Sequence, residues 1–284
     1  MPALLLGAVA YDPKVVTIWE GFRTWLREAG LDLDFVLYSN YERQVDDLLD
    51  GRIGLAWNSP LAWVRARRAA AARGIQVSAV AMRDTDRDLT SAVVVRRDSP
   101  FQWPADLRGH VVGTGAIDSP QATLLPLSVL RAAGLSVGRD VEVRRFDIGV
   151  GLHGDHIGGE RQAAAALRDG DVDAACVTDS NLLLFGREGT LAGNSVRVIG
   201  QTAAYDHCNM TAGPAAEPDE VQRFAGMLLA MSYADPRVRP LLDLEGLTRW
   251  LPGRSDRYAA LEAAVDEAGF YDEKGEVIAA GYRP

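Results

Sequence analysis

Two of the four histidines of this chain lie in one glycine-rich stretch, GVGLHGDHIGGE, at residues 149–160. His153 and His156 precede an alanine-rich run whose composition is typical of a helix. The start of a helix offers unpaired backbone N–H groups and a partial positive charge, so polar side chains placed there suit an anion. The stretch therefore predicts part of a binding site in which the two histidines donate hydrogen bonds.

A second turn of this kind lies at Asp118-Ser119-Pro120. Proline suits the first position of a helix and serine suits its N-cap, so a helix is expected to begin here. Ser119 and the free N–H groups at the start of the helix would then hold an oxyanion. The alternative is that Ser119 only caps the helix, although a capping serine can still touch a ligand.

Four residues have the side-chain types that bind zinc or iron, namely His156, Glu160, His207 and Cys208. His156 and Glu160 are four residues apart and would share one face of a helix. No CxxC or HExxH spacing accompanies them, so we favour no metal and expect hydrogen-bonding roles instead. Cys208 as a nucleophile activated by a histidine is a further alternative. Neighbouring strand residues point to opposite faces, so His207 and Cys208 are not expected to share one.

The bulk composition is that of an acidic globular protein. The 284 residues carry a net charge of −9, which argues against a nucleic-acid partner. Two cysteines cannot build a disulfide scaffold. No apolar run is long enough to span a membrane, and no signal peptide is recognisable. The sequence leaves two locations open: the cytoplasm, or the periplasm or cell exterior if a leader has been removed.

Apolar runs typical of buried strands alternate with amphipathic stretches typical of helices. Strands are expected at 3–10, 33–39, 53–57, 76–82, 90–96, 110–115, 141–146, 172–177, 195–201 and 207–212. Helices are expected at 13–29, 42–50, 61–73, 121–133, 217–233 and 257–268, and from the histidine turn to about 168, with a loose tail at 272–284. Such repeated winding predicts an α/β fold whose sheets are mostly parallel and flanked by helices.

Ligands of wound α/β sheets bind beyond the carboxyl ends of the strands. Polar and aromatic residues expected at those ends form the predicted ligand-binding set. This set comprises Tyr11, Asn58, Ser59, Ser91, Asp118, Ser119, Gln121, Thr123, His153, His156, Asp179, His207 and Asn209.

Several segments, in order along nearly the whole chain, resemble the type II periplasmic substrate-binding proteins, in particular their phosphonate-, phosphite- and sulfonate-binding branch. They are VDDLLDGRIGLA at 45–56, DSP at 98–100 with ADLRG at 105–109, DSPQAT at 118–123, and His156 followed by DGDVDAA at 169–175. Pro120, Gln121 and Ala122 depart from the family's serine- and threonine-rich cradle.

The resemblance implies a two-lobed type II fold with the ligand cleft between the lobes. Lobe one would comprise 1–97 and 199–284, with lobe two, 98–198, inserted. It further implies a solute-binding protein that clamps a small polar or anionic ligand, such as a phosphonate, phosphate ester or sulfonate, without a cofactor. Its partner would be an ABC permease, and it would be a monomer or weak dimer.

A cytoplasmic enzyme on the same fold is the alternative, because fold does not fix function. Relatives of this architecture make thiamine-pyrimidine or menaquinone precursors. Zinc or iron, held by His156, Glu160, His207 and Cys208, would then be its cofactor.

Overall fold

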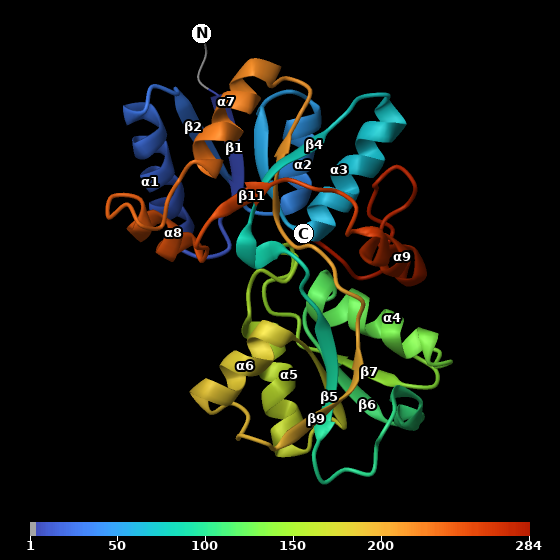
Figure 1. Ribbon diagram of the computed structural model, residues 1–284. Coiled ribbons are helices and arrows are strands. Elements are labelled where there is room, and N and C mark those ends of the chain that lie inside the picture. The colour runs from blue at the N-terminus through green and yellow to red at the C-terminus, as the bar shows by residue number, and fades with distance from the viewer. Residues whose placement is uncertain (1–3) are drawn as a thin grey trace.

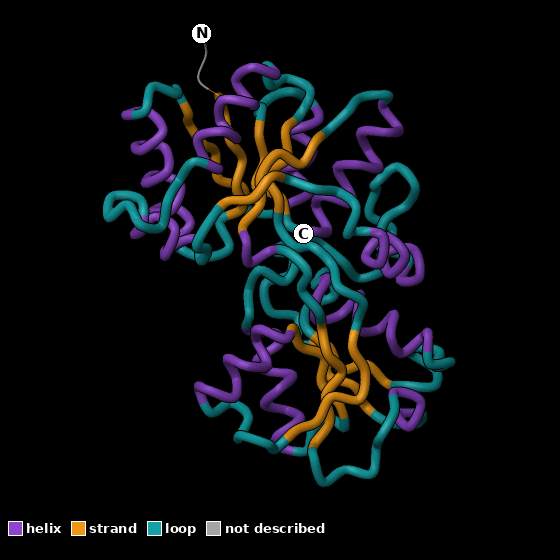
Figure 2. The backbone as a smooth tube through the Cα atoms, in the orientation of Figure 1, coloured by secondary structure: helices purple, strands orange, loops and turns teal. Residues whose placement is uncertain are grey.

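The computed structural model describes residues 4–284, so residue 3, the expected start of the first strand, lies outside the described part. The chain forms two α/β lobes, one above the other in Figure 1, and each has its own sheet. Figure 2 shows the two groups of strands separated by loops that cross between the lobes. This arrangement is the predicted two-lobed fold.

The first lobe holds a six-stranded sheet in the order β11-β4-β10-β3-β1-β2. Its strands are β1 (Leu4–Val9), β2 (Leu33–Tyr38), β3 (Leu55–Asn58), β4 (Ser78–Arg83), β10 (Asn209–Ala212) and β11 (Trp250–Pro252). Helices α1 (Lys14–Glu28), α7 (Pro218–Leu229) and α8 (Arg239–Glu245) pack into one apolar cluster with this sheet. Helices α2 (Tyr41–Leu49) and α3 (Pro60–Arg73) pack together into another.

The second lobe holds a five-stranded sheet in the order β7-β6-β8-β5-β9. Its strands are β5 (Ser91–Arg96), β6 (Val111–Thr114), β7 (Glu142–Arg145), β8 (Ala174–Thr178) and β9 (Val196–Gln201). Helix α4 (Leu125–Ala132) packs in one apolar cluster of this lobe, and α5 (Gly158–Asp169) and α6 (Asp179–Glu188) pack in another. Helix α6 had not been expected from the sequence.

The sheets are mixed, which refines the prediction that they are mostly parallel. In the first sheet, β10 runs antiparallel between β3 and β4, and β11 is antiparallel to β4. In the second, β5 is antiparallel to both β8 and β9. β5 and β10 are the strands that follow the two crossings between the lobes, and each runs antiparallel to both of its neighbours. The predicted lobe ranges would place β5 and the end of β9 in the first lobe, whereas both strands pair in the second sheet.

Two connecting segments, residues 84–90 and 202–208, carry the chain between the lobes. They pair through the bridge between Leu89 and Tyr205, and the backbone N–H of His207 donates to the carbonyl of Asp86 at 2.7 Å. The short 3-10 turns η1 (Asp84–Asp86) and η2 (Pro104–Leu107) lie at the beginning of the first crossing and after β5. The crossings therefore form one double-stranded connection.

The C-terminal segment ties the lobes together at a second place. Phe270, Tyr271 and Tyr282 pack in one cluster with Leu124 and Leu125 of the second lobe. Helix α9 (Ala259–Ala268) contacts both α4 and the π-helical turn η3 (Pro120–Leu124). The expectation of a loose tail is therefore wrong for Tyr282, which is only 1% exposed.

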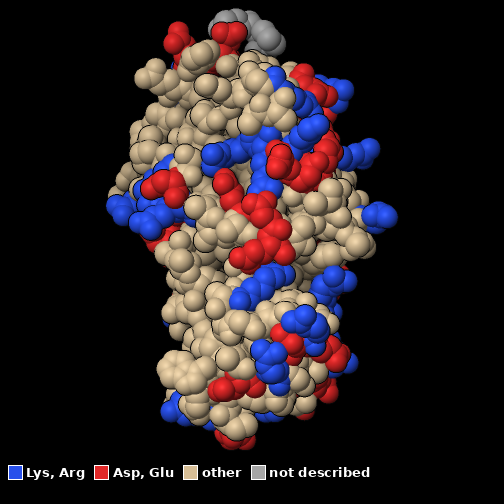
Figure 3. All heavy atoms as spheres, turned by 90° about the vertical axis from the view of Figure 1, so that its right-hand side faces the viewer, with Lys and Arg blue, Asp and Glu red and all other residues tan. Residues whose placement is uncertain are grey.

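The surface over α3 and α9 carries charges of both signs, as the face in Figure 3 shows. Arg67 pairs with Glu262 at 2.8 Å and Arg73 with Asp50 at 2.9 Å. Such exposed pairs contribute at most about 1 kcal/mol each. Within residues 4–284, no helix combines the length and apolar composition needed to cross a membrane.

Candidate functional site

A cavity of about 420 Å³ lies between the two lobes, where the strand ends of both sheets face each other. Its wall includes groups from α1, η1 and α8 on one side, and from η3, the 149–157 loop and the start of α6 on the other. The lining residues are Tyr11, Lys14, Trp57, Arg83, Thr85, Asp86, Leu89, Gln121, Gly154, Asp155, Ile157, Thr178, Ser180, Asn181, His207, Cys208, Glu245 and Gly246. A small solute enclosed here would touch both lobes.

Arg83, at the end of β4, is held by two carboxylates in the cavity wall. Its Nε and Nη2 donate to the two oxygens of Asp86 at 2.6 and 2.8 Å, and its Nη1 donates to Glu245 Oε1 at 3.3 Å. Burial alone raises the pKa of Asp86, but attraction and hydrogen bonds from Arg83 outweigh it and lower that pKa to about 2. For Glu245, burial dominates and raises the pKa to about 7.

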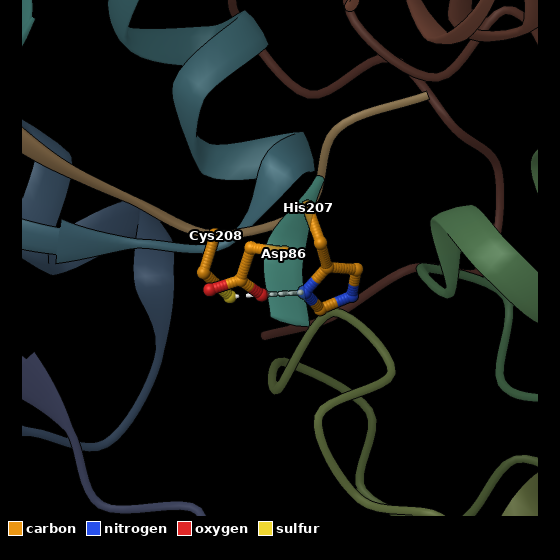
Figure 4. A group of neighbouring side chains, drawn as sticks. All are labelled: Asp86, His207 and Cys208. Atoms are coloured by element: carbon orange, nitrogen blue, oxygen red, sulfur yellow. Dashed lines mark hydrogen bonds and ion pairs between the residues drawn. The ribbon is translucent and has the colours of Figure 1, made fainter. Parts of the chain in front are cut away.

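His207 and Cys208 lie beside this pair (Figure 4). Nδ1 of His207 is 3.1 Å from Sγ of Cys208 and 3.5 Å from Oδ1 of Asp86. The prediction that the two side chains point to opposite faces is wrong, because β10 begins only at Asn209 and the preceding residues are not in a strand.

Among residues 4–284, Asp86, His207 and Cys208 form the only group of at least three metal-ligand side chains within 4.8 Å of one another. Of the four residues suggested for a metal, His207 and Cys208 belong to this group, and His156 and Glu160 do not. His156 is exposed and precedes α5 rather than lying on it, and its Nδ1 accepts from the N–H of Gly158 at 3.1 Å. Glu160 is buried and accepts from the Thr178 N–H and the Asn181 amide, each at 2.9 Å.

The chemistry of this group also disfavours a metal. Asp86 already receives two hydrogen bonds from Arg83, and burial raises the pKa of the Cys208 thiol. A neutral thiol is neither a good ligand nor a nucleophile. The arrangement suits a hydrogen-bonded wall.

Tyr11 and Asp155 line the cavity from opposite lobes. Asp155 accepts a hydrogen bond from the hydroxyl of Tyr41, and burial raises the pKa of its carboxyl. Burial also raises the pKa of Tyr11, and the charges of Glu245 and Asp155 add to the effect. Tyr11 therefore faces both carboxylates as a neutral phenol.

Gln121 reaches the cavity from η3, and the loop with Gly154 lies over it. Nε2 of Gln121 donates to the Gly154 carbonyl at 2.7 Å, and a Cβ added to Gly154 would lie 2.5 Å from Ser119 Oγ. Ser119 is a helix cap, because its Oγ accepts from the N–H of Ala122 at 3.1 Å. The loop thus covers the helix start that had been expected to hold an oxyanion.

His153 is fully buried in a contact between the lobes and does not line the cavity. Its Nδ1 is 2.7 Å from Ser59 Oγ, its Nε2 is 3.0 Å from Glu42 Oε1, and its ring stacks on Tyr41. Tyr271 and Tyr282 each donate to the same Glu42 oxygen at 2.9 Å. Burial alone would raise the pKa of Glu42. The charge of His153 and these hydrogen bonds outweigh burial and lower the pKa of Glu42 to about 2.

Of the predicted ligand-binding residues, Tyr11, Gln121 and His207 line the cavity. The others are not among the lining residues, and most of them hold neighbouring segments in place. Asn58 donates to the Thr211 hydroxyl, and that hydroxyl donates to Asn209. The Ser91 hydroxyl is hydrogen-bonded to the Tyr205 hydroxyl, and Thr123 donates to the Ala116 carbonyl. Asp118 accepts from the N–H groups of Gly151 and His153, and Asp179 accepts from Thr90 and Gln201.

The charged part of the wall does not follow from sequence patterns. Lys14, Arg83, Asp86, Asp155 and Glu245 were not predicted, because charged residues in loops are more often solvated than enclosed. For Asp86 a signal was available, since it lies in the crossing between the lobes. For Glu245 the sequence holds no such signal, because α8 is short and lies 162 residues from Arg83 in the chain.

Comparison with known proteins places the chain in a family. A family profile described as ABC transporter, phosphonate, periplasmic substrate-binding protein matches residues 8–258. The structure of XAC2383 from Xanthomonas citri bound to ATP superposes with a TM-score of 0.71 at 19% identity, covering 94% of this chain and 98% of that one. The structure of PhnD1 from Prochlorococcus marinus in complex with methylphosphonate superposes with a TM-score of 0.69 at 16% identity, covering 94% of this chain and 98% of that one.

The aliphatic sulphonate binding protein SsuA from Escherichia coli gives a TM-score of 0.54 at 19% identity, covering 94% of this chain and 87% of that one. At such identities the structures show a shared fold. The profile supports the binding-protein hypothesis and not the enzyme alternative. The chain, with its match over most of its length and its cleft between two lobes, belongs to the family of phosphonate periplasmic substrate-binding proteins of ABC transporters.

Proposed function

We propose that the protein captures a small phosphonate-, phosphate-ester- or sulfonate-type solute in the cavity between its lobes and presents it to an ABC permease. The observation that carries this proposal is the open cleft of about 420 Å³, whose wall comes from both lobes and includes charged and polar side chains. A solute that touches both lobes stabilises the closed arrangement, which a permease can then distinguish from the open one.

The proposal includes no cofactor, because the Asp86 carboxylate that a metal would need is taken by Arg83. It places the protein in the periplasm, in keeping with the family. It also has the protein act as a monomer or weak dimer, since one chain supplies both walls of the cavity. Size-exclusion chromatography with light scattering would test the oligomeric state.

Calorimetric titration tests the binding function. The panel is ethylphosphonate, 2-aminoethylphosphonate, ethanesulfonate and 2-aminoethanesulfonate. We expect one molecule of at least one of them to bind per chain, with a raised melting temperature in the same buffer. Failure of the whole panel to bind would overturn the assignment of this solute class.

A further inference from the structure

The loop of residues 149–157 belongs to the second lobe but inserts into the first. Its backbone is attached to the second lobe, because the N–H groups of Gly151 and His153 donate to the Asp118 carboxylate at 2.7 and 3.1 Å. The side chain of Leu152 packs instead against the apolar cluster that α2 and α3 form in the first lobe. The loop is therefore held by both lobes at once.

His153 makes the polar contacts of this insertion. Its Nδ1 lies 2.7 Å from Ser59 Oγ, its Nε2 lies 3.0 Å from Glu42 Oε1, and its ring stacks on Tyr41 with the ring centroids 4.7 Å apart. All three partners belong to the first lobe, and His153 is fully buried among them. None of the three lines the cavity, so these contacts join the lobes with or without a solute.

The C-terminal segment covers the inserted loop. Tyr271 and Tyr282 both donate to Glu42 Oε1, and their hydroxyl oxygens lie 3.5 and 3.4 Å from His153 Nε2. Val150 of the loop packs against the apolar cluster that contains both tyrosines. The last residues of the chain therefore help to keep the loop in the first lobe.

The backbone of the loop is strained at its most buried point. His153 has a φ of +50°, in the left-handed region that residues with a side chain seldom adopt. Gly149, Gly151 and Gly154 around it also have positive φ, which costs glycine little. A strained residue persists only where its surroundings fix it, and such residues are concentrated at clamps and switches. The strain favours withdrawal of His153 once its contacts break, and the glycines allow the loop to change course.

From these contacts we infer that loop 149–157 is a latch, which must leave the first lobe before the cavity can open. Gly154 and Asp155 of the same loop line the cavity, so the lobes cannot part at this point while His153 stays inserted. The latch favours the docked arrangement of the lobes, and a solute then enters and leaves only as fast as the latch is released. The inference rests on the proposed function for this kinetic consequence, but not for the latch itself.

The distance between the lobes tests the latch without any solute. Spin labels at Glu28→Cys in α1 and Arg187→Cys in α6 report this distance, because both positions are exposed and the two helices lie on one side of the molecule in different lobes (Figure 1). Cys176 and Cys208 are buried and should stay unlabelled. We expect pulsed electron paramagnetic resonance to give one distance, which the four panel solutes leave unchanged. A longer distance that shortens when a solute is added would overturn the inference.

His153→Asn should release the latch. Asparagine tolerates the left-handed φ, but it is too short to join Ser59 and Glu42. We expect a second population with a longer distance between the labels in the protein without solute. His110→Asn is the matched control and should keep the single distance, because His110 pairs with Asp173 within the second lobe at 3.2 Å. The wild-type distance in a folded His153→Asn protein would overturn the inference.

The rates of solute binding distinguish a latch from a purely structural role. Stopped-flow mixing with the four panel solutes can be followed by tryptophan fluorescence, because Trp57 lines the cavity. In His153→Asn we expect association and dissociation both to be about tenfold faster with Kd changed less than about threefold, since the latch stabilises the docked lobes equally with and without solute. Unchanged rates in the folded variant would overturn the inference.

A second variant covers the case in which His153→Asn does not fold. Leu152→Ala removes the apolar contacts of the same loop with the first lobe, and it should give the same longer distance and faster rates. Wild-type behaviour of Leu152→Ala in both measurements would overturn the inference. If none of the four solutes binds, the proposed function fails, and the distance measurement alone decides the latch.

Discussion

Arg83 donates to both carboxylate oxygens of Asp86, at 2.6 Å from Nε and 2.8 Å from Nη2. The pair lies in the wall of the cavity, and Asp86 is 2% exposed. The one enclosed guanidinium is thereby held away from a solute by a carboxylate of the protein itself. The charge of Arg83 is therefore already matched by a carboxylate of the protein in this structure.

Asp86→Asn should release Arg83 toward an anion. We expect affinity for ethylphosphonate to increase by about tenfold or more, because one cavity carboxylate is removed and the guanidinium loses its ionic partner. The free energy of unfolding should fall by about 3 kcal/mol, as is usual when a buried pair loses one charge. Calorimetry checks the first effect and urea unfolding the second, with Asp169→Asn as an exposed control. A folded variant with no gain in affinity would show that Asp86 does not limit anion binding.

Glu42→Gln should weaken the junction between the lobes. The change removes the charge that faces His153 and loosens the hydrogen bonds from Tyr271 and Tyr282, so we expect a loss of about 2–4 kcal/mol in the free energy of unfolding at pH 7. The pKa of Glu42 is about 2 in the folded protein against an ordinary 4.5. The contribution of this carboxylate is therefore present above pH 4.5 and lost as the pH falls toward 2.

Denaturant unfolding of wild type and Glu42→Gln at several pH values measures this effect. The difference between them should shrink steadily as the pH falls below 4.5. Glu20→Gln, which removes an exposed carboxylate that pairs with Arg23, should cost less than about 1 kcal/mol. A difference for Glu42 that is the same at pH 3 and pH 7 would contradict the ionic role given to it.

Much of this architecture could be predicted from residues near one another in the sequence. The pattern DGRIGLAWN, followed by Ser59, predicted β3 and the helix capped behind it. The pattern GDVDAACV likewise predicted β8. The helix α6 that follows it, capped by Thr178, was not predicted. In each case a glycine with positive φ, Gly51 or Gly170, lies between the preceding helix and the strand. Local propensities and turn chemistry are enough to specify such units.

The site itself depended on contacts that no local pattern encodes. Arg83 and Glu245 are 162 residues apart, and Tyr41 and Asp155 are 114 apart. His153 had the sequence setting of a ligand contact, yet the structure uses it to join Ser59 and Glu42 across the lobes. Whether a polar side chain lines a cavity or supports its wall is decided by the packing of the lobes, which sequence spacing does not reveal.

Glu245→Gln should make stability less sensitive to pH. The folded pKa of about 7 lies above the ordinary 4.5, so the wild type loses stability as the pH rises from 4.5 to about 7. Glutamine has no charge to desolvate, and the variant should be more stable than wild type at pH 8 by about 1–3 kcal/mol. At pH 4.5 the gain should be much smaller. Thermal unfolding of wild type and Glu245→Gln at both pH values measures the difference in stability. An equal difference at pH 4.5 and pH 8 would contradict the burial of this charge.

Gly154→Ala should displace the loop over Gln121. A Cβ at this position would lie 2.5 Å from both Gln121 Nε2 and Ser119 Oγ, and the backbone φ of +78° is strained for alanine. We expect a loss of about 1–3 kcal/mol in stability together with weaker solute binding. Gly193→Ala, where a Cβ meets nothing within 4 Å, is the control and should leave both unchanged. Retention of wild-type stability in Gly154→Ala would show that the loop does not rest on Gln121.

The most direct test of the cavity as the solute site is to fill it. Ser180 lines the cavity at the exposed start of α6, so tryptophan there would occupy the space without changing the core. Val198→Trp, at an exposed position of β9 that is 48% accessible, is the control. With 2-aminoethylphosphonate in the calorimeter, we predict one site per chain in wild type and in Val198→Trp, and binding at least about tenfold weaker in Ser180→Trp. Wild-type affinity in Ser180→Trp would contradict the assignment and place the solute elsewhere.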